Sequence, residues 1–358
     1  MLPIFRPYDT PRDGAPVLAA GGVSRRRLPL NFSEEDLPLF EDALESAIPQ
    51  TRLLELEGVG VSPEGMLFKD GQILPESFSS PSIMEKFLDR RRSVLKFLAD
   101  NYLLRRRRKF GRDCLWIVDD WSAGYFHWLA DALSRLYAAR DAAKDLVLLL
   151  PHRYRELEFV QSSLKAFAVR GVEYVGAGEV YLCRKLFMPS HVAPSGNYNE
   201  EVVRGLREML VGFYGREGAG SGAGERVYLS RGRAPKRKVS NEGELLDTLR
   251  EFDFRVVHFE DHPFEEQVRI AAGARVLVSN HGAGLTNMLF MKPGGRVLEL
   301  RRRDERERNW FFNLASATGL EYFYQLCDPE NPDEGPHTAN LIVDPRLFRE
   351  NIRLMLAG

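Results

Sequence analysis

The chain has 358 residues, of which 44% are hydrophobic and 28% are charged, as in an ordinary globular protein long enough for two domains. Its 50 Lys and Arg residues balance 51 Asp and Glu residues, so the net charge of −1 gives no bias toward nucleic acid. The three cysteines lie far apart and form no C-x-x-C pair, so neither a disulfide framework nor a cysteine zinc site is indicated. A reducing, cytoplasmic setting fits this pattern best.

No apolar run approaches the roughly 18 residues that a transmembrane helix requires. The first residues, MLPIFRPYDTPRDG, carry prolines and charges where a signal peptide needs an apolar segment. We therefore expect a cytoplasmic protein, whose contact with membranes, if any, is peripheral and at the inner membrane face.

Residues 1–80 show short apolar runs and turn signals, including a hairpin signal at Asp70-Gly71, and no chemistry. A helical pattern from Ser82 to about Lys109 follows, with basic clusters at 90–92 and 105–109. These clusters are either a solvated helix face or a surface that attracts anionic lipid head groups or a phosphate-rich acceptor. Nucleic acid is disfavoured because no aromatic side chains alternate with the arginines.

The apolar run 114–118 predicts a buried strand, and a helix follows from about Tyr125. His127 and Asp131 are four residues apart and thus share one face of that helix, near the edge of an open α/β sheet where ligands bind. A histidine beside a carboxylate can act as a general base toward a hydroxyl, but the same spacing also occurs in an ordinary structural hydrogen bond. A metal site is less favoured, because no further His or Cys cluster accompanies the pair.

Strands and helices then alternate in a way that predicts a parallel, doubly wound sheet with right-handed crossovers. The predicted elements are strand 146–150, helix 153–169, strands 172–175 and 185–188, and helix 200–214. The glycine run 215–224 is interpreted as a flexible loop, because it follows a helix and precedes a strand and lacks the G-x-G-x-x-G spacing of a dinucleotide fingerprint.

A second α/β unit begins with strand 226–229, which ends at Ser230-Arg231. The following loop contains Arg237, and Asn241-Glu242 open a helix that runs to about residue 251. A basic loop between a strand and a capped helix suits a diphosphate, although a charged surface loop has the same composition. Strand 254–259, the loop from Phe259 to His262, where a nucleotide base could lie, and helix 263–272 come next.

The stretch 274–300 has the pattern on which the rest of the second unit depends. A buried strand at 275–279 leads to Asn280-His281-Gly282-Ala283-Gly284, a short helix at 285–291 and a strand at 297–300. A glycine turn that leads into a helix can bind an anion, and His281, Asn287 and Glu299 add polar groups. A charged segment, a strand near 322–326 and a last helix from about Pro345 complete the chain.

Several motifs in this order resemble the family 61 glycosyltransferases: HWLAD at 127–131, VYLSR at 227–231, Arg237 with Asn241-Glu242, SNHGAGLTNMLFM at 279–291 and VLEL at 297–300. The resemblance covers about residues 53–326, and HGAGLTN is its most specific part. It implies a GT-B architecture, in which two Rossmann-like, doubly wound α/β domains face each other across a cleft. Residues 1–195 would form the acceptor-side domain with an irregular N-terminal extension, 196–344 the donor domain, and 345–358 a helix returning to the first domain.

The resemblance further implies an inverting, metal-independent transfer from a nucleotide sugar, most simply a UDP-sugar, to a hydroxyl of a glycan or glycolipid in surface polysaccharide (capsule) synthesis. No cofactor or metal would be required. The chain itself contains no D-x-D pair, so positive groups must stabilise the leaving diphosphate.

By this resemblance Asp131 is the expected base, with His127 as the next candidate. Glu299 would hold the ribose hydroxyls, and His281 and Asn287 would line the diphosphate and sugar. The expected donor-site residues are Ser230, Arg231, Arg237, Asn241, Glu242, Phe259, His281, Gly282, Ala283, Gly284, Asn287 and Glu299. The chain departs from the family at Gly124-Tyr125-Phe126, where a polar residue often precedes the His-Trp pair, and this affects acceptor contacts rather than the fold.

Two further classes of function stay open. One is a non-catalytic nucleotide-sugar-binding module that regulates or scaffolds polysaccharide assembly, and the other is a surface-binding protein that uses the arginine runs. An α/β-hydrolase is disfavoured because G-x-S-x-G is absent, and a Walker A motif is also absent. Nothing in the sequence indicates an oligomeric state.

Overall fold

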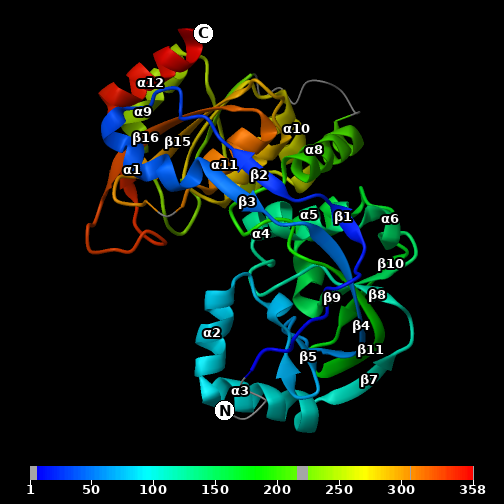
Figure 1. Ribbon diagram of the computed structural model, residues 1–358. Helices are drawn as coiled ribbons and strands as arrows, with labels where there is room; N and C mark the ends of the chain where they lie inside the picture. Colours follow the sequence, from blue (N-terminus) through cyan, green and yellow to red (C-terminus); the bar gives the residue numbers. More distant parts are fainter. Residues whose placement is uncertain (1–5, 216–224, 307, 358) are drawn as a thin grey trace. The chain divides into compact units, whose positions relative to one another are not determined.

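The computed structural model describes residues 6–215, 225–306 and 308–357, which fold into two compact units (Figure 1). The first unit comprises residues 6–22 and 48–195, and the second comprises the remaining described residues. The division between residues 195 and 196 coincides with the predicted one, but the segment 23–47 belongs to the second unit, which the sequence did not indicate. Apart from Gly215, the predicted glycine loop lies outside the described residues.

The sheet of the first unit is mixed: the four strands predicted to alternate with helices are parallel, as expected, but antiparallel strands from the N-terminal part of the chain extend the same sheet. Four strands, in the order β10, β9, β8 and β11, are parallel neighbours. Strand β4 pairs antiparallel with β11, and β5 and β1 pair antiparallel with β4. The bounds are β1 Val17–Ala19, β4 Thr51–Val61, β5 Leu67–Lys69, β6 Gln72–Ile73, β7 Arg106–Phe110, β8 Cys114–Leu115, β9 Val147–Pro151, β10 Gly171–Val175 and β11 Glu179–Pro189. The predicted hairpin at Asp70-Gly71 is confirmed between β5 and β6, with positive φ at both turn residues.

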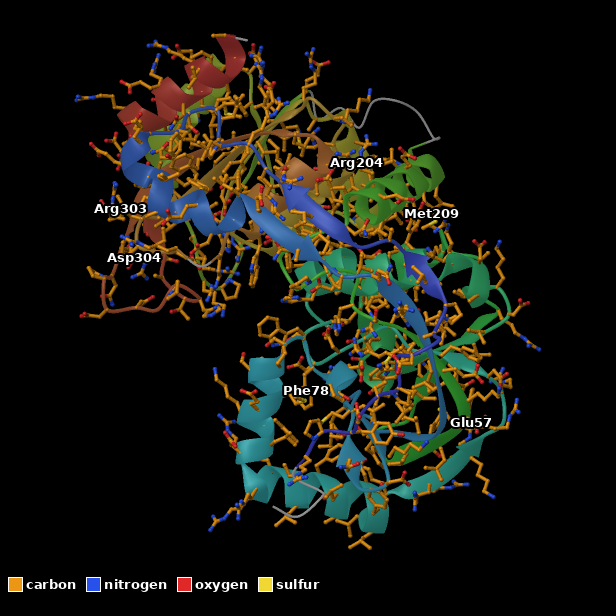
Figure 2. All side chains as sticks on the ribbon, in the orientation of Figure 1. Glu57, Phe78, Arg204, Met209, Arg303 and Asp304 are labelled. Carbon is orange, nitrogen blue, oxygen red and sulfur yellow. The ribbon has the colours of Figure 1, made fainter. Side chains whose placement is uncertain are left out.

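The predicted helix from Ser82 to Lys109 is correct as far as Leu104. It is formed by α2 (Pro81–Asp89), α3 (Arg91–Ala99) and a π-helical turn at Asp100–Leu104, after which the second basic cluster extends as β7. Among the described strands, β7 pairs only with β11, and an edge strand tolerates charged side chains that a central strand would not. Phe78, just before α2, packs 5.6 Å from Phe87 and joins these helices to the sheet (Figure 2).

After β8 the chain forms the predicted helix from Tyr125, divided into α4 (Tyr125–His127), a π-helical turn (Trp128–Ala132) and α5 (Leu133–Ala138). The later helices of this unit, α6 (Arg140–Ala143) and α7 (Glu158–Leu164), are short, so the predicted helix 153–169 forms only in its central part. The parallel strands β8 and β11 both lead at their carboxyl ends into loops next to α4.

The second unit has a six-stranded sheet in the order β13-β12-β14-β15-β16-β17, parallel except for the last strand. Its strands are β12 Arg226–Leu229, β13 Arg255–Val257, β14 Val276–Asn280, β15 Arg296–Arg302, β16 Glu321–Pro329 and β17 Leu341–Ile342. The predicted α/β class is thus confirmed. Because the second strand in sequence lies outside the first, the strand order reverses between β12 and β14, and ligands bind at such a switch point in open α/β sheets.

The helices of this unit are α8 Glu200–Tyr214, α9 Glu242–Glu251, α10 Phe264–Gly273, α11 Trp310–Thr318 and α12 Pro345–Ala357, with a 3₁₀ helix at Ala283–Phe290. The prediction that residues 345–358 return to the first domain is wrong, since α12 packs on α9 and β16. Phe348, Ile352 and Met355 recur at helical spacing and are buried in the core of the second unit. No helix among the described residues combines the length and apolar character of a bilayer span.

The segment 23–47 is held to the second unit by Asn31 and Phe40. The Asn31 side chain accepts from the backbone N–H of Tyr324 at 3.1 Å and donates to its carbonyl at 2.6 Å. The Phe40 ring lies 5.1 Å from Phe312 and 5.0 Å from Tyr324. A segment of the N-terminal part therefore covers the α11 and β16 side of the second sheet.

Candidate functional site

The predicted donor-site residues gather at the switch point of the second unit. Ser230 and Arg231 follow β12, and His281 and Gly282 follow β14, so parallel pairing of these strands brings both loops to one edge. The predicted helix after the HGAG turn forms as a 3₁₀ helix, Ala283–Phe290, rather than as an α-helix. Asn287 donates to the carbonyl of Gly284 at 2.9 Å and thereby closes its first turn.

Both glycines of the turn lie close to side chains of β12 and the residue after it. A Cβ atom on Gly282 would lie 2.6 Å from Nη1 of Arg231, and one on Gly284 would lie 2.9 Å from Cδ2 of Leu229. The turn thus lies directly against the guanidinium group of Arg231. The G-x-G pattern here allows the side chain of Arg231 to lie close to the backbone of the turn, and it would equally allow a ligand to do so.

Arg231 and Arg237 form a pair of cations with no carboxylate in direct contact. None of the ion pairs in the described part of the chain includes either residue, and Nε of Arg237 is buried without a hydrogen-bond partner. Burial lowers the pKa of Arg231, and burial together with the nearby charge of Arg231 lowers the pKa of Arg237 to about 10. Both remain positive at neutral pH, so their surroundings favour an anion.

The backbone of Arg237 explains how the pair is held. Arg237 has φ +55°, in the left-handed region that non-glycine residues rarely adopt. Its carbonyl accepts from Nε of Arg231 at 3.2 Å and from the side chain of Asn280 at 2.5 Å. The loop is therefore connected to both β12 and β14 before any ligand arrives.

A third cation, Arg308, lies near this pair. Its charge acts to lower the pKa of Arg237, and its guanidinium group lies 3.0 Å from Glu305 and 2.5 Å from Nε2 of His337. Burial, followed by the charges of Arg308 and Arg237, lowers the pKa of His337. Sequence reasoning missed Arg308 and His337, because neither is near the motifs of the loop in sequence.

Glu299 does not have the geometry that we expected of it. It has no exposed surface, and its two carboxylate oxygens lie 2.5 Å from Nδ1 of His281 and from the hydroxyl of Tyr322. Burial opposes ionisation, but the hydrogen bond and charge of His281 and the charge of Arg301 outweigh it and lower the pKa of Glu299. A group without exposed surface cannot hold ribose hydroxyls in this structure, so we assign Glu299 to orienting His281.

Glu242, Asn241 and Phe259 also have structural contacts. Glu242 accepts from the hydroxyl groups of Tyr228 and Ser230, both at 2.9 Å. Asn241 pairs with both backbone groups of Val343, at 2.8 and 2.9 Å, and Phe259 is buried. These residues position the loop, while Arg231, Arg237 and His281 carry its polar chemistry.

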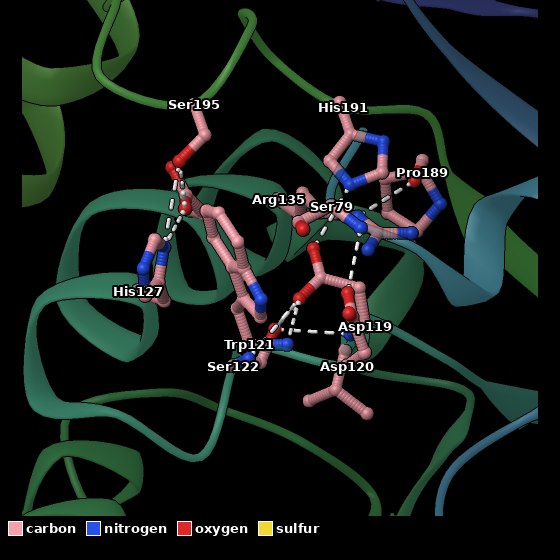
Figure 3. Close-up of polar contacts among 12 residues, drawn as sticks. Ser79, Asp119, Asp120, Trp121, Ser122, His127, Arg135, Pro189, His191 and Ser195 are labelled. Atoms are coloured by element: carbon pink, nitrogen blue, oxygen red, sulfur yellow. Dashed lines mark hydrogen bonds and ion pairs between the residues drawn. The ribbon is translucent and has the colours of Figure 1, made fainter. Parts of the chain in front are cut away.

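In the first unit the structure brings His127 and Asp131 together as predicted (Figure 3). Nδ1 of His127 lies 2.8 Å from Oδ2 of Asp131, and the Ser195 hydroxyl donates to the same oxygen at 3.0 Å. The Trp121 ring, which is partly exposed, lies 4.9 Å from the imidazole. The carboxylate thus fixes the orientation of the ring, an arrangement that also occurs where a histidine acts as a base.

A second histidine–carboxylate pair lies at the same strand ends, and the sequence analysis missed it. Oδ2 of Asp119, after β8, lies 3.0 Å from Nε2 of His191, after β11 (Figure 3). Its other oxygen accepts from the N–H groups of Trp121 and Ser122 and from the Ser122 hydroxyl. Burial alone would raise the pKa of Asp119, but the hydrogen bond and charge of His191, with smaller effects of Arg135 and Ser122, lower it to about 2.

Arg135 is buried beside both carboxylates. Its Nε donates to the carbonyl of Pro189 at 2.9 Å, and its other two nitrogens have no hydrogen-bond partner among the residues that the structure describes. Burial lowers the pKa of Arg135, whereas the charges of Asp119, Glu76 and Asp131 act in the opposite direction. This buried cation favours the ionised form of the carboxylates near it.

No group of three or more His, Cys, Asp or Glu side chains that could hold a metal ion occurs among the residues that the structure describes.

The chain is similar to known glycosyltransferases. The sequence model of the family Glycosyltransferase 61 matches residues 125–298, which contain both His127–Asp131 and the HGAG turn. Protein O-linked-mannose beta-1,4-N-acetylglucosaminyltransferase 2 of Mus musculus is 36% identical over 114 residues, which are 31% of this chain and 19% of that protein. The Bos taurus counterpart is 37% identical over 150 residues, 40% of this chain and 25% of that protein.

A third relative has a different name. EGF domain-specific O-linked N-acetylglucosamine transferase of Drosophila melanogaster is 36% identical over 116 residues, 31% of this chain and 22% of that protein. The matches thus span about a fifth to a quarter of the length of these relatives. The resemblance to family 61 that the motifs predicted is confirmed.

The Asp119 pair predicts a specific loss of stability in acid. Because the folded-state pKa of about 2 is below the ordinary value of 3.8, the ionised carboxylate stabilises the fold above about pH 4, and this contribution disappears as the pH falls toward 2. The difference corresponds to about 2 kcal/mol. Urea unfolding of the wild type and of Asp119→Asn at several pH values should show two curves that converge below pH 4. Parallel curves over this range would contradict the assignment.

Proposed function

We propose, from the match of the Glycosyltransferase 61 sequence model to residues 125–298, that the protein transfers a sugar from a nucleotide sugar to a hydroxyl of a glycan or glycoconjugate acceptor. The observation that carries the proposal is the pair Arg231 and Arg237, two cations at the switch point of a parallel sheet that take part in no ion pair among the described residues. A nucleoside diphosphate leaving group supplies the anion that such a pair lacks.

The donor half of the reaction needs charge stabilisation. When the bond between the sugar C1 and the diphosphate oxygen breaks, negative charge grows on the diphosphate, and Arg231 and Arg237 can stabilise it there. Guanidinium groups bind phosphate in a bidentate manner and are fixed in advance by the loop contacts of Arg231. We therefore propose transfer that requires no metal ion, with a UDP-sugar as the first donor to test.

The acceptor half needs a base, and the geometry favours His127 over Asp131. Oδ2 of Asp131 already accepts from Ser195 and faces Nδ1 of His127, which is the arrangement in which a carboxylate orients an imidazole. Nε2 of His127 would take the proton of the acceptor hydroxyl, whose oxygen then attacks C1 on the face opposite the diphosphate. One such displacement inverts the anomeric configuration.

Trp121 provides a surface for the acceptor sugar. Its ring is 37% exposed and lies next to the ring of His127. A flat aromatic face can pack against the C–H groups of a sugar ring and so place a hydroxyl near the base. The acceptor would therefore bind at the carboxyl ends of β8 and β11, in the first unit.

We further propose a GT-B type enzyme, with acceptor chemistry in the first unit and the donor in the second. Both units have parallel strands whose carboxyl ends carry the candidate residues, and this organisation supports two Rossmann-like domains. A role in cytoplasmic surface polysaccharide synthesis agrees with the three cysteines, which are all buried free thiols. Burial, with the nearby charge of Asp328, raises the pKa of Cys327 to about 12.

The arginine pair predicts a loss of donor affinity. Arg231→Ala and Arg237→Ala should each weaken UDP binding by roughly ten- to a hundredfold in titration calorimetry, because each removes charge-assisted hydrogen bonds to phosphate. Uridine, which lacks the diphosphate, should be affected much less. Arg233→Ala is the matched control, since Arg233 lies in the same loop but pairs with Asp261. Unchanged UDP affinity in both site variants would exclude this donor site.

The base assignment predicts a separation of binding from turnover. His127→Asn should lower the rate of UDP release from a UDP-sugar, with a mixture of sugar acceptors, by roughly 10²- to 10⁴-fold while UDP affinity stays at the wild-type value. Asp131→Asn should lower the rate less, because it disturbs only the orientation of the ring. His152→Asn, at the end of β9 in the same unit, serves as control. Full activity of His127→Asn would contradict the mechanism, and nucleotide binding without turnover in the wild type would favour the non-catalytic module.

The Trp121 surface predicts an effect on the acceptor alone. Trp121→Ala should raise the acceptor KM by roughly three- to tenfold, the size expected for one aromatic contact, with a smaller change in kcat. Trp121→Phe should retain most of the affinity. An equal loss in both variants, or an effect on the KM of the donor instead, would remove Trp121 from the acceptor site.

A further inference from the structure

A surface segment of the first unit, residues 90–109, combines exposed leucines with a dense positive charge. It is formed by α3, the π-helical turn 100–104 and β7, and we call it the basic face. Leu95, Leu103 and Leu104 are 51%, 80% and 77% exposed, and the last two have the greatest exposure of any large hydrophobic side chain in the described residues. Leucines as exposed as Leu103 and Leu104 contribute little to the stability of the fold, because they contact mainly water.

The charge of this face is unlike that of the rest of the chain. Residues 90–109 contain nine Lys and Arg residues and one Asp, a net charge of +8, whereas the whole chain has −1. Arg105 pairs with Glu64, and Arg108 contacts Tyr181. No ion pair among the described residues includes Arg106 or Lys109, so this part of the charge is left for an external anion.

The orientation of α3 follows from its buried side. Val94 and Phe97 are buried, and the Phe97 ring lies 5.6 Å from Phe68 of the sheet. This packing directs Leu95, between them in sequence, away from the core. The exposed leucines are therefore fixed by the fold of the unit and do not depend on a flexible end of the chain.

We infer that the basic face docks on an anionic lipid bilayer, with Leu103 and Leu104 entering the head-group region and the arginines contacting lipid phosphates. Segments that bind at the membrane interface combine apolar side chains with surrounding cations. Burial of the apolar side chains and attraction of the cations to anionic lipids both contribute to the free energy of binding, and the two contributions add. Nucleic acid fits less well: Tyr102, the aromatic residue of this turn, is partly buried and has Arg107 over its ring at 5.0 Å.

The basic face is connected to the candidate acceptor site within the same unit. Asp120, next to the Asp119 pair, accepts from the backbone N–H of Ser79 at 2.8 Å and donates its own N–H to the carbonyl of Ser77 at 3.0 Å. These serines directly precede α2, which leads into α3. Docking would thus bring the unit that carries His127 to a lipid surface, which suits a lipid-linked acceptor, although the docking itself does not depend on the proposed reaction.

Sedimentation with vesicles tests the inference on the full chain without donor or acceptor. The wild type should bind vesicles in which about a third of the lipid is anionic phosphatidylglycerol, should not bind phosphatidylcholine alone, and should be released by salt. Leu103→Ser with Leu104→Ser should weaken binding by roughly tenfold or more, and Arg106→Gln, Arg107→Gln and Lys109→Gln together by on the order of a hundredfold.

The matched control is Leu347→Ser with Leu354→Ser, two exposed leucines that also lie among arginines, on α12 of the second unit. This control should bind vesicles like the wild type. UDP affinity should be the same in all variants, so a failure of docking is distinguishable from a failure of the proposed function. Equal binding to both kinds of vesicle, wild-type binding by the Leu103 and Leu104 variant, or preference for a nucleic acid over anionic vesicles would overturn the inference.

Discussion

The carbonyl of Arg237 accepts from Nε of Arg231 and from the side chain of Asn280, and the candidate donor site depends on these two contacts. The guanidinium group of Arg231 also lies against Gly282, so a Cβ atom at this position would displace it. One arginine therefore connects the ends of β12 and β14 with the loop between them. The two positive charges are in place before a ligand binds, and a preorganised charge of this kind costs little reorganisation when a leaving group develops negative charge.

In the first unit the candidate site contains carboxylates that already have partners, in contrast to the two arginines of the second unit. Asp119 and Asp131 each face a histidine. The buried side chain of Arg135 lies beside both carboxylates. The polar groups come from the ends of β8 and β11 and from the helical segment 125–138, so the parallel half of the sheet creates this cluster just as β12 and β14 create the candidate donor site. The antiparallel half carries none of these side chains, and the sequence indicated its hairpin but not the pairing of β4 with β11.

A local sequence pattern was sufficient to predict a helix or strand when only one of its faces is buried. Helix 200–214, strand 226–229 and the His127–Asp131 contact could be predicted, because their periodicity or spacing is visible within a few residues. The sequence could not show β7, whose charged residues form a strand only because β11 is available to pair with them. Helix α11 was missed because it is buried almost all round and lacks a polar face. Asp119 and His191 are 72 residues apart and meet only through the strand order.

We propose that Arg231 and Arg237 stabilise the diphosphate of the donor where a metal ion would otherwise do so. Calorimetric titration of the wild-type protein with UDP and UMP, in excess EDTA and again in excess Mg²⁺, tests this role. UDP should bind more tightly than UMP, and with the same Kd in both buffers, if the two arginines contact the second phosphate themselves. UDP binding that appears only with Mg²⁺, or equal affinity for UDP and UMP, would contradict it.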